Sequence, residues 1–256
     1  MPNATRIAIA NQKGGVGKTT SCFALAAAKA KSGAMTLMID LDPQYSLTES
    51  CGMMPDDAAF TSKNTCNLFS KKTDLLKCCF NVKSVKLNNL FIVPATQDLA
   101  MINKKIFTKA GIVNTFKSNI DTLSRFFDYI FIDCPPQLDG LLTSALAAAD
   151  KVVVPVKAER LSYKGLKLIT GSINEAKITG LNPTLELTGL VITMYRQQTR
   201  EHNEYLQKME QEENNILGIV PLATIVTKEL DKGKPCTVAH PTSNASKAYF
   251  EIANKL

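Results

Sequence analysis

The chain alternates between short apolar runs and longer segments in which apolar residues recur with a helical period. The apolar runs are rich in Val, Ile and Leu, as strands buried on both faces of a sheet should be. Strands are predicted at residues 7–11, 36–40, 90–94, 129–133, 151–156, 186–193 and 217–220. Helices are predicted near residues 17–32, 97–104, 112–125, 139–149, 161–179, 199–213 and 243–255. This alternation predicts an α/β fold, a mostly parallel twisted β-sheet with helices on both faces.

Residues 51–88 have the weakest pattern. The stretch Cys51-Gly-Met-Met-Pro-Asp-Asp57 predicts a loop, and short helices are expected in the rest of this region. No repeat, low-complexity tract or linker interrupts the chain, so residues 1–256 are predicted to form a single domain.

Composition narrows the function classes. A hydrophobic content of 45% and a charged content of 21% are typical of soluble globular proteins. The formal charge of +7 permits an anionic partner such as nucleic acid. The seven Cys include no Cys-x-x-Cys pair and are expected to be reduced cytosolic thiols, and two His argue against histidine-based metal or triad chemistry. No signal peptide is expected, and no apolar run is long enough for a transmembrane helix.

A glycine-rich segment lies between the first predicted strand and the first predicted helix. It reads Lys13-Gly-Gly-Val-Gly-Lys-Thr-Thr20, and Gln12 stands where the strict phosphate-loop pattern has Gly, so this is the deviant form. Glycines let the backbone wrap around phosphate, and the helix N-terminus favours an anion. Lys18 would contact the β- and γ-phosphates of a nucleotide, and Thr19 would bind Mg²⁺. The predicted nucleotide-binding residues of this loop are Gly14, Gly15, Val16, Gly17, Lys18, Thr19 and Thr20.

Acidic residues end two of the predicted strands. Asp40 and Asp42 come at the end of the second strand, and Asp133 ends the strand at 129–133. Ligands of open α/β sheets bind at the carboxyl edge of the strands, and carboxylates are hard ligands that suit Mg²⁺. Thr19, Asp42 and Asp133 are therefore the predicted magnesium residues.

These motifs resemble the ParA/MinD family of deviant Walker A ATPases, which are P-loop NTPases, and most closely its Soj-like ParA partition branch. The resemblance covers nearly the whole chain and depends on residues 10–20, 39–44, 127–136, 145–155 and 233–235. It implies a sandwich homodimer that forms with ATP, in which Lys13 reaches the partner's ATP. It also implies that Asp42 orients the attacking water, that Asp133 holds Mg²⁺ through water, and that Met194 and Pro221 line the adenine pocket.

The family resemblance implies slow ATP hydrolysis, stimulated by a ParB-like partner, with Lys13, Lys18 and Asp42 as the catalytic residues. It also implies DNA binding without sequence preference, in the cytoplasm and on the nucleoid, to segregate a plasmid or chromosome. The expected DNA-binding residues are Arg196, Arg200, Lys228, Lys232 and Lys234, with Lys247 and Lys255. Soj-like proteins usually carry a DNA-binding Arg after the position of Pro221, and this chain has Leu222-Ala-Thr-Ile-Val-Thr-Lys-Glu-Leu230 there.

Other readings compete with DNA partition. A MinD-like membrane switch would need a basic amphipathic C-terminal helix, and residues 247–256 match the family's closing core helix instead. A switch that positions a protein cargo stays open. An iron-protein reductase would need paired cluster cysteines, and Cys134 has no clear second ligand. About a dozen residues precede Lys13, so no N-terminal helix-turn-helix module is expected.

Overall fold

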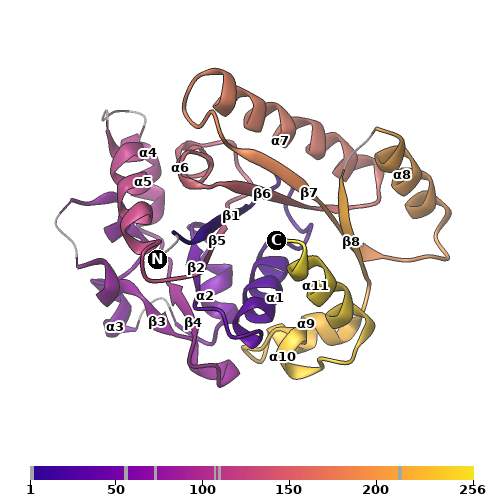
Figure 1. Cartoon of the computed structure of the whole chain (residues 1–256), viewed down its shortest axis with the longest axis horizontal. Helices are drawn as coiled ribbons and strands as arrows, with labels where there is room; N and C mark the ends of the chain where they lie inside the picture. The colour runs from indigo at the N-terminus through magenta and orange to yellow at the C-terminus, as the bar shows by residue number, and fades with distance from the viewer. Residues whose placement is uncertain (1–2, 55–56, 72–73, 107, 109–110, 213–214) are drawn as a thin grey trace.

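The computed structural model describes residues 3–54, 57–71, 74–106, 108, 111–212 and 215–256, and contains one eight-stranded sheet (Figure 1). The strand order is β3-β4-β2-β5-β1-β6-β7-β8. All neighbouring strands pair in parallel except β3 and β4. The strands are β1 (Thr5–Ile9), β2 (Thr36–Asp40), β3 (Phe80–Asn81), β4 (Leu90–Val93), β5 (Tyr129–Asp133), β6 (Lys151–Lys157), β7 (Glu186–Tyr195) and β8 (Ile216–Pro221).

Helices cover both faces of this sheet, and the sheet separates two apolar cores. Ile7 and Ile9 of β1 pack with the core beneath α1 (Lys18–Lys31) and α11 (Asn244–Asn254). Ala8, one residue along, packs with the core on the other face. That face is covered by α5 (Ile112–Leu123), α6 (Gly140–Ala148) and α7 (Arg160–Ile178) (Figure 1). Because successive side chains of a strand point to opposite faces of the sheet, one apolar run contributes residues to both cores.

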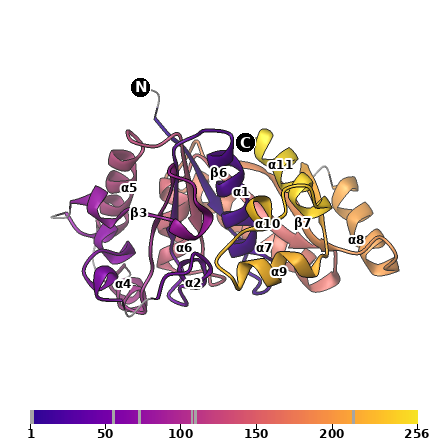
Figure 2. The same cartoon turned by 90° about the horizontal axis from the view of Figure 1, so that it is seen from below.

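The remaining helices lie mostly at the ends of the sheet. Figure 2 shows α4 (Leu99–Ile106) with α5 at one end of the molecule and α8 (Arg200–Gln211) at the other. Two short helices follow strands, α2 (Ser46–Ser50) after β2 and α9 (Thr224–Leu230) after β8, and α10 (Cys236–Ala239) comes next after α9. Among the described residues, no helix is long and apolar enough to span a membrane.

The predicted fold class is confirmed, a mostly parallel sheet with helices on both faces. All seven predicted strands exist, although β1 begins and ends two residues earlier than predicted. The two-residue β3 and the short α2, α9 and α10 were not predicted, because one or two turns show no clear hydrophobic period. In the region 51–88, positions 55–56 of the predicted loop and positions 72–73 lie outside the described residues. The described residues form short elements, as expected: α3 (Ala58–Thr61) and the 3-10 helices η1 (Thr65–Phe69), η2 (Leu75–Cys78) and η3 (Lys83–Val85). Position 213 of the predicted helix 199–213 lies outside the described residues.

Candidate nucleotide site

The glycine-rich segment forms a tight loop between β1 and α1. Gly15 and Gly17 adopt left-handed φ angles of 70° and 82°, which side-chain-bearing residues reach only with strain. Gly17 directly precedes α1, so the free N–H groups of the helix start point toward the loop. Val16 is fully buried, and its carbonyl accepts a hydrogen bond from Thr193 Oγ1 at 2.8 Å. The loop is therefore fixed to β7 as well as to the strand and helix that it joins.

A cavity of about 280 Å³ opens in front of this loop. Residues from three sequence motifs line it together, and the set is Gly14, Gly15, Gly17, Lys18, Thr19, Thr20, Asp42, Ser46, Pro136 and Met194. The helix N-terminus and the Lys18 ammonium make one side of the cavity suitable for an anion. Ser46 and Pro136 were not predicted from the sequence, although each follows a strand-end acid by only three or four residues.

The hydroxyl of Thr19 joins the loop to the end of β5. Thr19 Oγ1 donates to Asp133 Oδ2 at 2.7 Å, and Asp133 is 1% exposed. Its second oxygen, Oδ1, is buried and has no hydrogen-bond partner among the described residues. Burial and the nearby Asp40 carboxylate raise the pKa of Asp133 well above its ordinary range. A hard oxygen with a spare lone pair beside a hydroxyl fits the donor set of a Mg²⁺ site.

Within the described ranges, no three His, Cys, Asp or Glu side chains gather as a ready-made metal cage. Mg²⁺ bound with a nucleotide does not require one, because phosphate oxygens and water supply most of its ligands. Thr19 and Asp133 therefore fit Mg²⁺, and Asp42, which lines the same cavity, lies close enough to Asp133 to affect its pKa.

The two lysines of the loop lie in different places. Lys18 is buried, and its ammonium donates to the Lys13 carbonyl at 3.1 Å. Burial lowers the pKa of Lys18, and the Asp133 carboxylate opposes that shift. Lys13 does not line the cavity, because its ammonium donates to Ser162 Oγ at 3.0 Å and lies 3.8 Å from Glu159 Oε2. In the single chain, Lys13 thus contacts the first turn of α7.

A second, mostly apolar pocket of about 70 Å³ adjoins the first. The two pockets share Gly17, Thr20 and Met194. Pro221 also lines the apolar pocket, and its other walls are Thr193, Val220, Leu222, Ala223, Val226, Thr227 and Tyr249. An apolar slot beside an anion-binding cavity is the arrangement that a nucleotide base and its phosphates require. Met194 and Pro221 line one pocket, and the walls from α9 and α11 could not be found from a motif.

The basic residues expected to bind DNA are exposed, and they lie on α8, α9 and α11 and in the segments next to these helices. Arg200 begins α8, which packs on one core through Met209. Lys228 is on α9, which packs on the other core through Val226 (Figure 1). Lys232 is paired with Glu229 at 2.8 Å. The other expected residues, all exposed, are Arg196, Lys234, Lys247 and Lys255. Arg200 and Lys228 therefore lie on helices that pack against opposite faces of the sheet, whereas Arg196 follows Tyr195, which pairs with Pro221 just ahead of α9.

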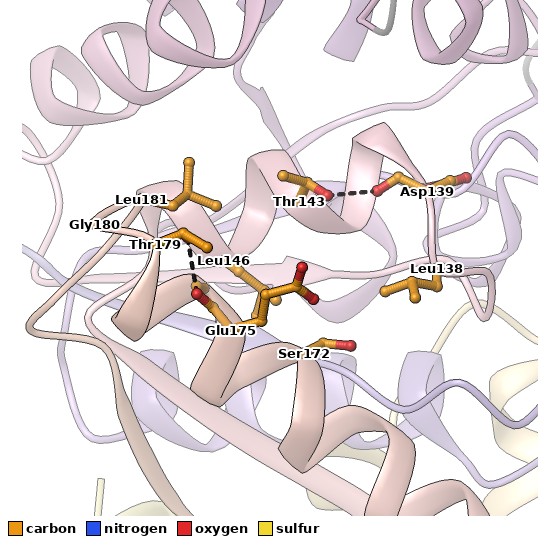
Figure 3. A pocket seen from close by; sticks show the side chains of 10 residues that line it. Leu138, Asp139, Thr143, Leu146, Ser172, Glu175, Thr179, Gly180 and Leu181 are labelled. Atoms are coloured by element: carbon orange, nitrogen blue, oxygen red, sulfur yellow. Dashed lines mark hydrogen bonds between the residues drawn. The ribbon is translucent and has the colours of Figure 1, made fainter.

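A larger groove of about 580 Å³ lies between α6 and α7 and shares no lining residue with the nucleotide cavity (Figure 3). Asp139 and Glu175 contribute acidic groups to it, and Leu138 is exposed at its edge. Ser172, also in the groove, accepts a hydrogen bond from Gln12 Nε2 at 3.0 Å. The groove thus borders the loop without forming part of the site.

Comparison with known proteins agrees with this geometry. A family model described as an AAA domain matches residues 4–187. The chromosome partitioning protein ParA of Myxococcus xanthus is 32% identical over 257 residues, covering 98% of this chain and 87% of that protein.

Two crystal structures share the fold and contain bound nucleotide. A putative plasmid partition protein from Borrelia burgdorferi bound to AMPPNP has a TM-score of 0.82 and 26% identity, covering 99% of this chain and 98% of that one. A cobyrinic acid a,c-diamide synthase from Mycobacterium smegmatis with bound ADP and magnesium has a TM-score of 0.83 and 28% identity, covering 98% of this chain and 93% of that one. This chain therefore belongs to the ParA-like family of AAA-domain P-loop NTPases.

Proposed function

We propose that this protein is a ParA-type ATPase that binds Mg²⁺ and ATP, dimerises with ATP, and hydrolyses it slowly. The observation that carries the proposal is the contact between Thr19, which lines the cavity with Lys18 and Asp42, and Asp133 with its unpartnered oxygen. The contact places the proposed phosphate-binding group, Lys18, and the proposed metal-binding groups, Thr19 and Asp133, next to one another, as phosphoryl transfer requires. The AMPPNP-bound partition protein and the ADP-and-magnesium-bound synthase support the choice of ligands.

Each side chain has a role in this proposal. The loop glycines and the start of α1 bind the phosphates, Lys18 donates to the β- and γ-phosphates, and Met194 and Pro221 hold the base. Thr19, Asp133 and Asp42 would hold Mg²⁺, which neutralises charge on the phosphate oxygens when bound. The Asp42 carboxylate accepts a hydrogen bond from the attacking water and so orients it toward the γ-phosphate.

Lys13 supplies the dependence on a second subunit. Its ammonium contacts α7 in the single chain and does not line the cavity of its own chain. In an ATP-bound dimer it would leave Ser162 and reach the partner's phosphates, where a cation supplied in trans acts like an arginine finger. Hydrolysis by the single chain is therefore slow, because the Lys13 ammonium joins the other charged groups around the phosphates only after dimerisation. A ParB-like protein would accelerate hydrolysis by the dimer.

The biological role that we propose is partition of a plasmid or chromosome through non-specific DNA binding in the cytoplasm, on the nucleoid. The relatives named as partition proteins support it, together with the net charge of +7. A switch that acts on a membrane or a protein cargo is the alternative. It gains support from the segment after Pro221, where this chain lacks the Arg that Soj-like proteins usually carry.

One experiment separates these roles. Co-sedimentation with unrelated duplex DNA is measured with ATP, ADP or no nucleotide across a salt series. The partition proposal predicts ATP-dependent binding that weakens steeply with salt, and that Arg200→Ala and Lys228→Ala each reduce the salt slope by about one. Glu210→Ala, on the same helix as Arg200, is the control. ATP-dependent dimers that bind no DNA at low salt would refute the partition role and favour a membrane or protein cargo.

Asp42→Ala tests the hydrolytic role. Without the carboxylate the water is not oriented, so ATP stays bound and the dimer persists after wild-type protein has returned to monomer. The measurement is phosphate release together with size-exclusion chromatography. Hydrolysis by Asp42→Ala at the wild-type rate would show that another group orients the water.

A further inference from the structure

The carboxylate of Asp40 is completely buried at the end of β2, next to the candidate site but outside both pockets. It accepts three hydrogen bonds. Asp42 N donates to Oδ1 at 3.1 Å, and Thr48 donates to Oδ2 twice, from its backbone N at 2.8 Å and from its hydroxyl at 2.7 Å. A buried carboxylate is stable only when donors of this kind surround it. All three come from the segment that follows β2, so Asp40 ties both ends of this segment to the sheet.

The hydroxyl of Thr48 has a second bond. It accepts from Ala95 N at 2.9 Å while it donates to Asp40, and Thr48 is completely buried. Ala95 lies just beyond β4, the strand beside β2 in the sheet. A single hydroxyl therefore links α2, which contains Thr48, to the ends of two adjacent strands.

The turn between these anchors is strained. Tyr45 has a left-handed φ of 45°, a conformation that disfavours a residue with a Cβ atom. The turn is closed by hydrogen bonds from Tyr45 N to the Asp42 carbonyl at 2.8 Å and from Gln44 N to Asp42 Oδ1 at 2.9 Å. Asp42 and Ser46, at the two ends of the turn, both line the nucleotide cavity. Strain of this kind persists only where the surrounding structure fixes the ends.

We propose that Asp40 and Thr48 are positioning residues, a clamp that holds the turn from Asp42 to Ser46 in the conformation that hydrolysis needs. Neither side chain lines the cavity, so neither contacts the nucleotide. They act through Asp42, whose carboxylate orients the water in the proposed function, on which this inference rests. Breaking the clamp lets the strained turn relax, and Asp42 leaves its position while the phosphate-binding loop is unchanged.

Thr48→Val tests the clamp, because it removes both bonds of the hydroxyl and keeps the branched shape. Thr48→Ser keeps the hydroxyl and is the conservative rescue. Thr65→Val is the matched control. Thr65 is also completely buried, and its hydroxyl donates to the carbonyls of Val93 and Pro94 at 3.2 and 3.1 Å, near the same strand end but away from the turn.

At saturating ATP and about pH 8, Thr48→Val is expected to lose roughly 10- to 100-fold in kcat, the effect of a catalytic group displaced by about 1 Å. Its affinity for ADP should stay within about twofold, because the loop and Lys18 are intact, and Thr48→Ser and Thr65→Val should hydrolyse near the wild-type rate. Wild-type kcat in Thr48→Val overturns the clamp. Loss of ADP affinity in folded Thr48→Val also overturns it, because the hydroxyl would then be needed to build the cavity.

A second readout keeps the test independent of activity. Hydrogen exchange in the segment 42–50 should be at least about tenfold faster in Thr48→Val than in wild type, and unchanged in Thr48→Ser and Thr65→Val. If wild-type protein hydrolyses no ATP, the proposed function fails while this exchange result still decides the clamp. If Thr48→Val does not fold, Asp40→Asn, which keeps the size and one acceptor oxygen, takes its place in both measurements. Exchange as slow as in wild type would refute the clamp.

Discussion

The dependence of stability on pH tests the environment of Asp40 directly. Burial raises the pKa of Asp40 from 3.8 to about 7, although the hydrogen bonds from Thr48 and Asp42 oppose the shift. In the unfolded chain the same carboxyl titrates near its ordinary pKa. Between these two values the folded protein keeps a proton that the unfolded chain has released, so raising the pH favours unfolding. This contribution to stability is complete below about pH 3.8 and is lost as the pH rises through about 7.

The magnitude follows from one proton. In this window the free energy of unfolding falls by about 1.4 kcal/mol for each pH unit, so Asp40 accounts for roughly 2 kcal/mol between about pH 5 and about pH 7. The perturbation is Asp40→Asn, which removes the titrating group and keeps its size. The variant is less stable overall because it loses an acceptor, but its stability should fall less with pH. The Asp40 carboxylate also helps to raise the pKa of Asp133, so Asp40→Asn should lower the pKa of Asp133 and flatten the variant's curve further.

The assay is urea denaturation of both proteins without nucleotide or Mg²⁺, at pH values from about 5 to about 8. The two curves of unfolding free energy against pH are expected to converge as the pH rises from about 5 toward 7. The m-value of each protein should stay constant, which shows that the denatured state is unchanged. Curves that run parallel from about pH 5 to about pH 7 would refute the reasoning, because Asp40 would then titrate alike in both states.

Three further predictions concern the loop. Thr193→Val removes the hydroxyl that donates to the buried Val16 carbonyl. The free energy of unfolding, measured by urea denaturation, should fall by about 1–3 kcal/mol, and Thr193→Ser should be close to wild type. Gly17→Ala places a Cβ atom at a residue whose φ is 82°, and should lower the free energy of unfolding by about 1–2 kcal/mol. It should also weaken ADP binding, measured by calorimetry. An unchanged stability would mean that the loop adopts another conformation. Glu159→Gln weakens the contact that holds half-buried Lys13 in the single chain. The ATP concentration needed for dimerisation, measured by sedimentation, should therefore fall by about two- to fivefold. A higher ATP concentration would mean that Glu159 stabilises the dimer.

The sequence predicted the parts of the site that lie within short motifs. The loop 13–20 and the acids at the ends of β2 and β5 could be placed because a parallel sheet brings its carboxyl ends to one edge. Asp40 and Asp42 both come at the end of the same apolar run, which does not by itself show how their environments differ. The structure separates them, because Asp40 turns into the protein and Asp42 lines the cavity.

Contacts between distant segments could not be read from the sequence. The ammonium of Lys13 donates a hydrogen bond to Ser162, which is 149 residues away in the sequence. Nothing in the type of either residue predicts this contact. The hydrogen bond from Ala95 N to the Thr48 hydroxyl depends on the register of β2 beside β4, which local sequence patterns do not determine. The same holds for the basic residues of α8 and α9, which are near in sequence but cover opposite faces of the sheet.

The central claim is that ATP, and not ADP, assembles two copies of this chain into a hydrolytic dimer. Sedimentation velocity with Mg²⁺ and ATP, and with Mg²⁺ and ADP, tests it most directly, with Asp42→Ala to prevent hydrolysis and Lys13→Ala to remove the trans cation. Asp42→Ala is expected to form dimers with ATP only, and Lys13→Ala is expected to stay monomeric with either nucleotide. Monomers of Asp42→Ala with saturating ATP, or equal dimerisation with ADP, would contradict it.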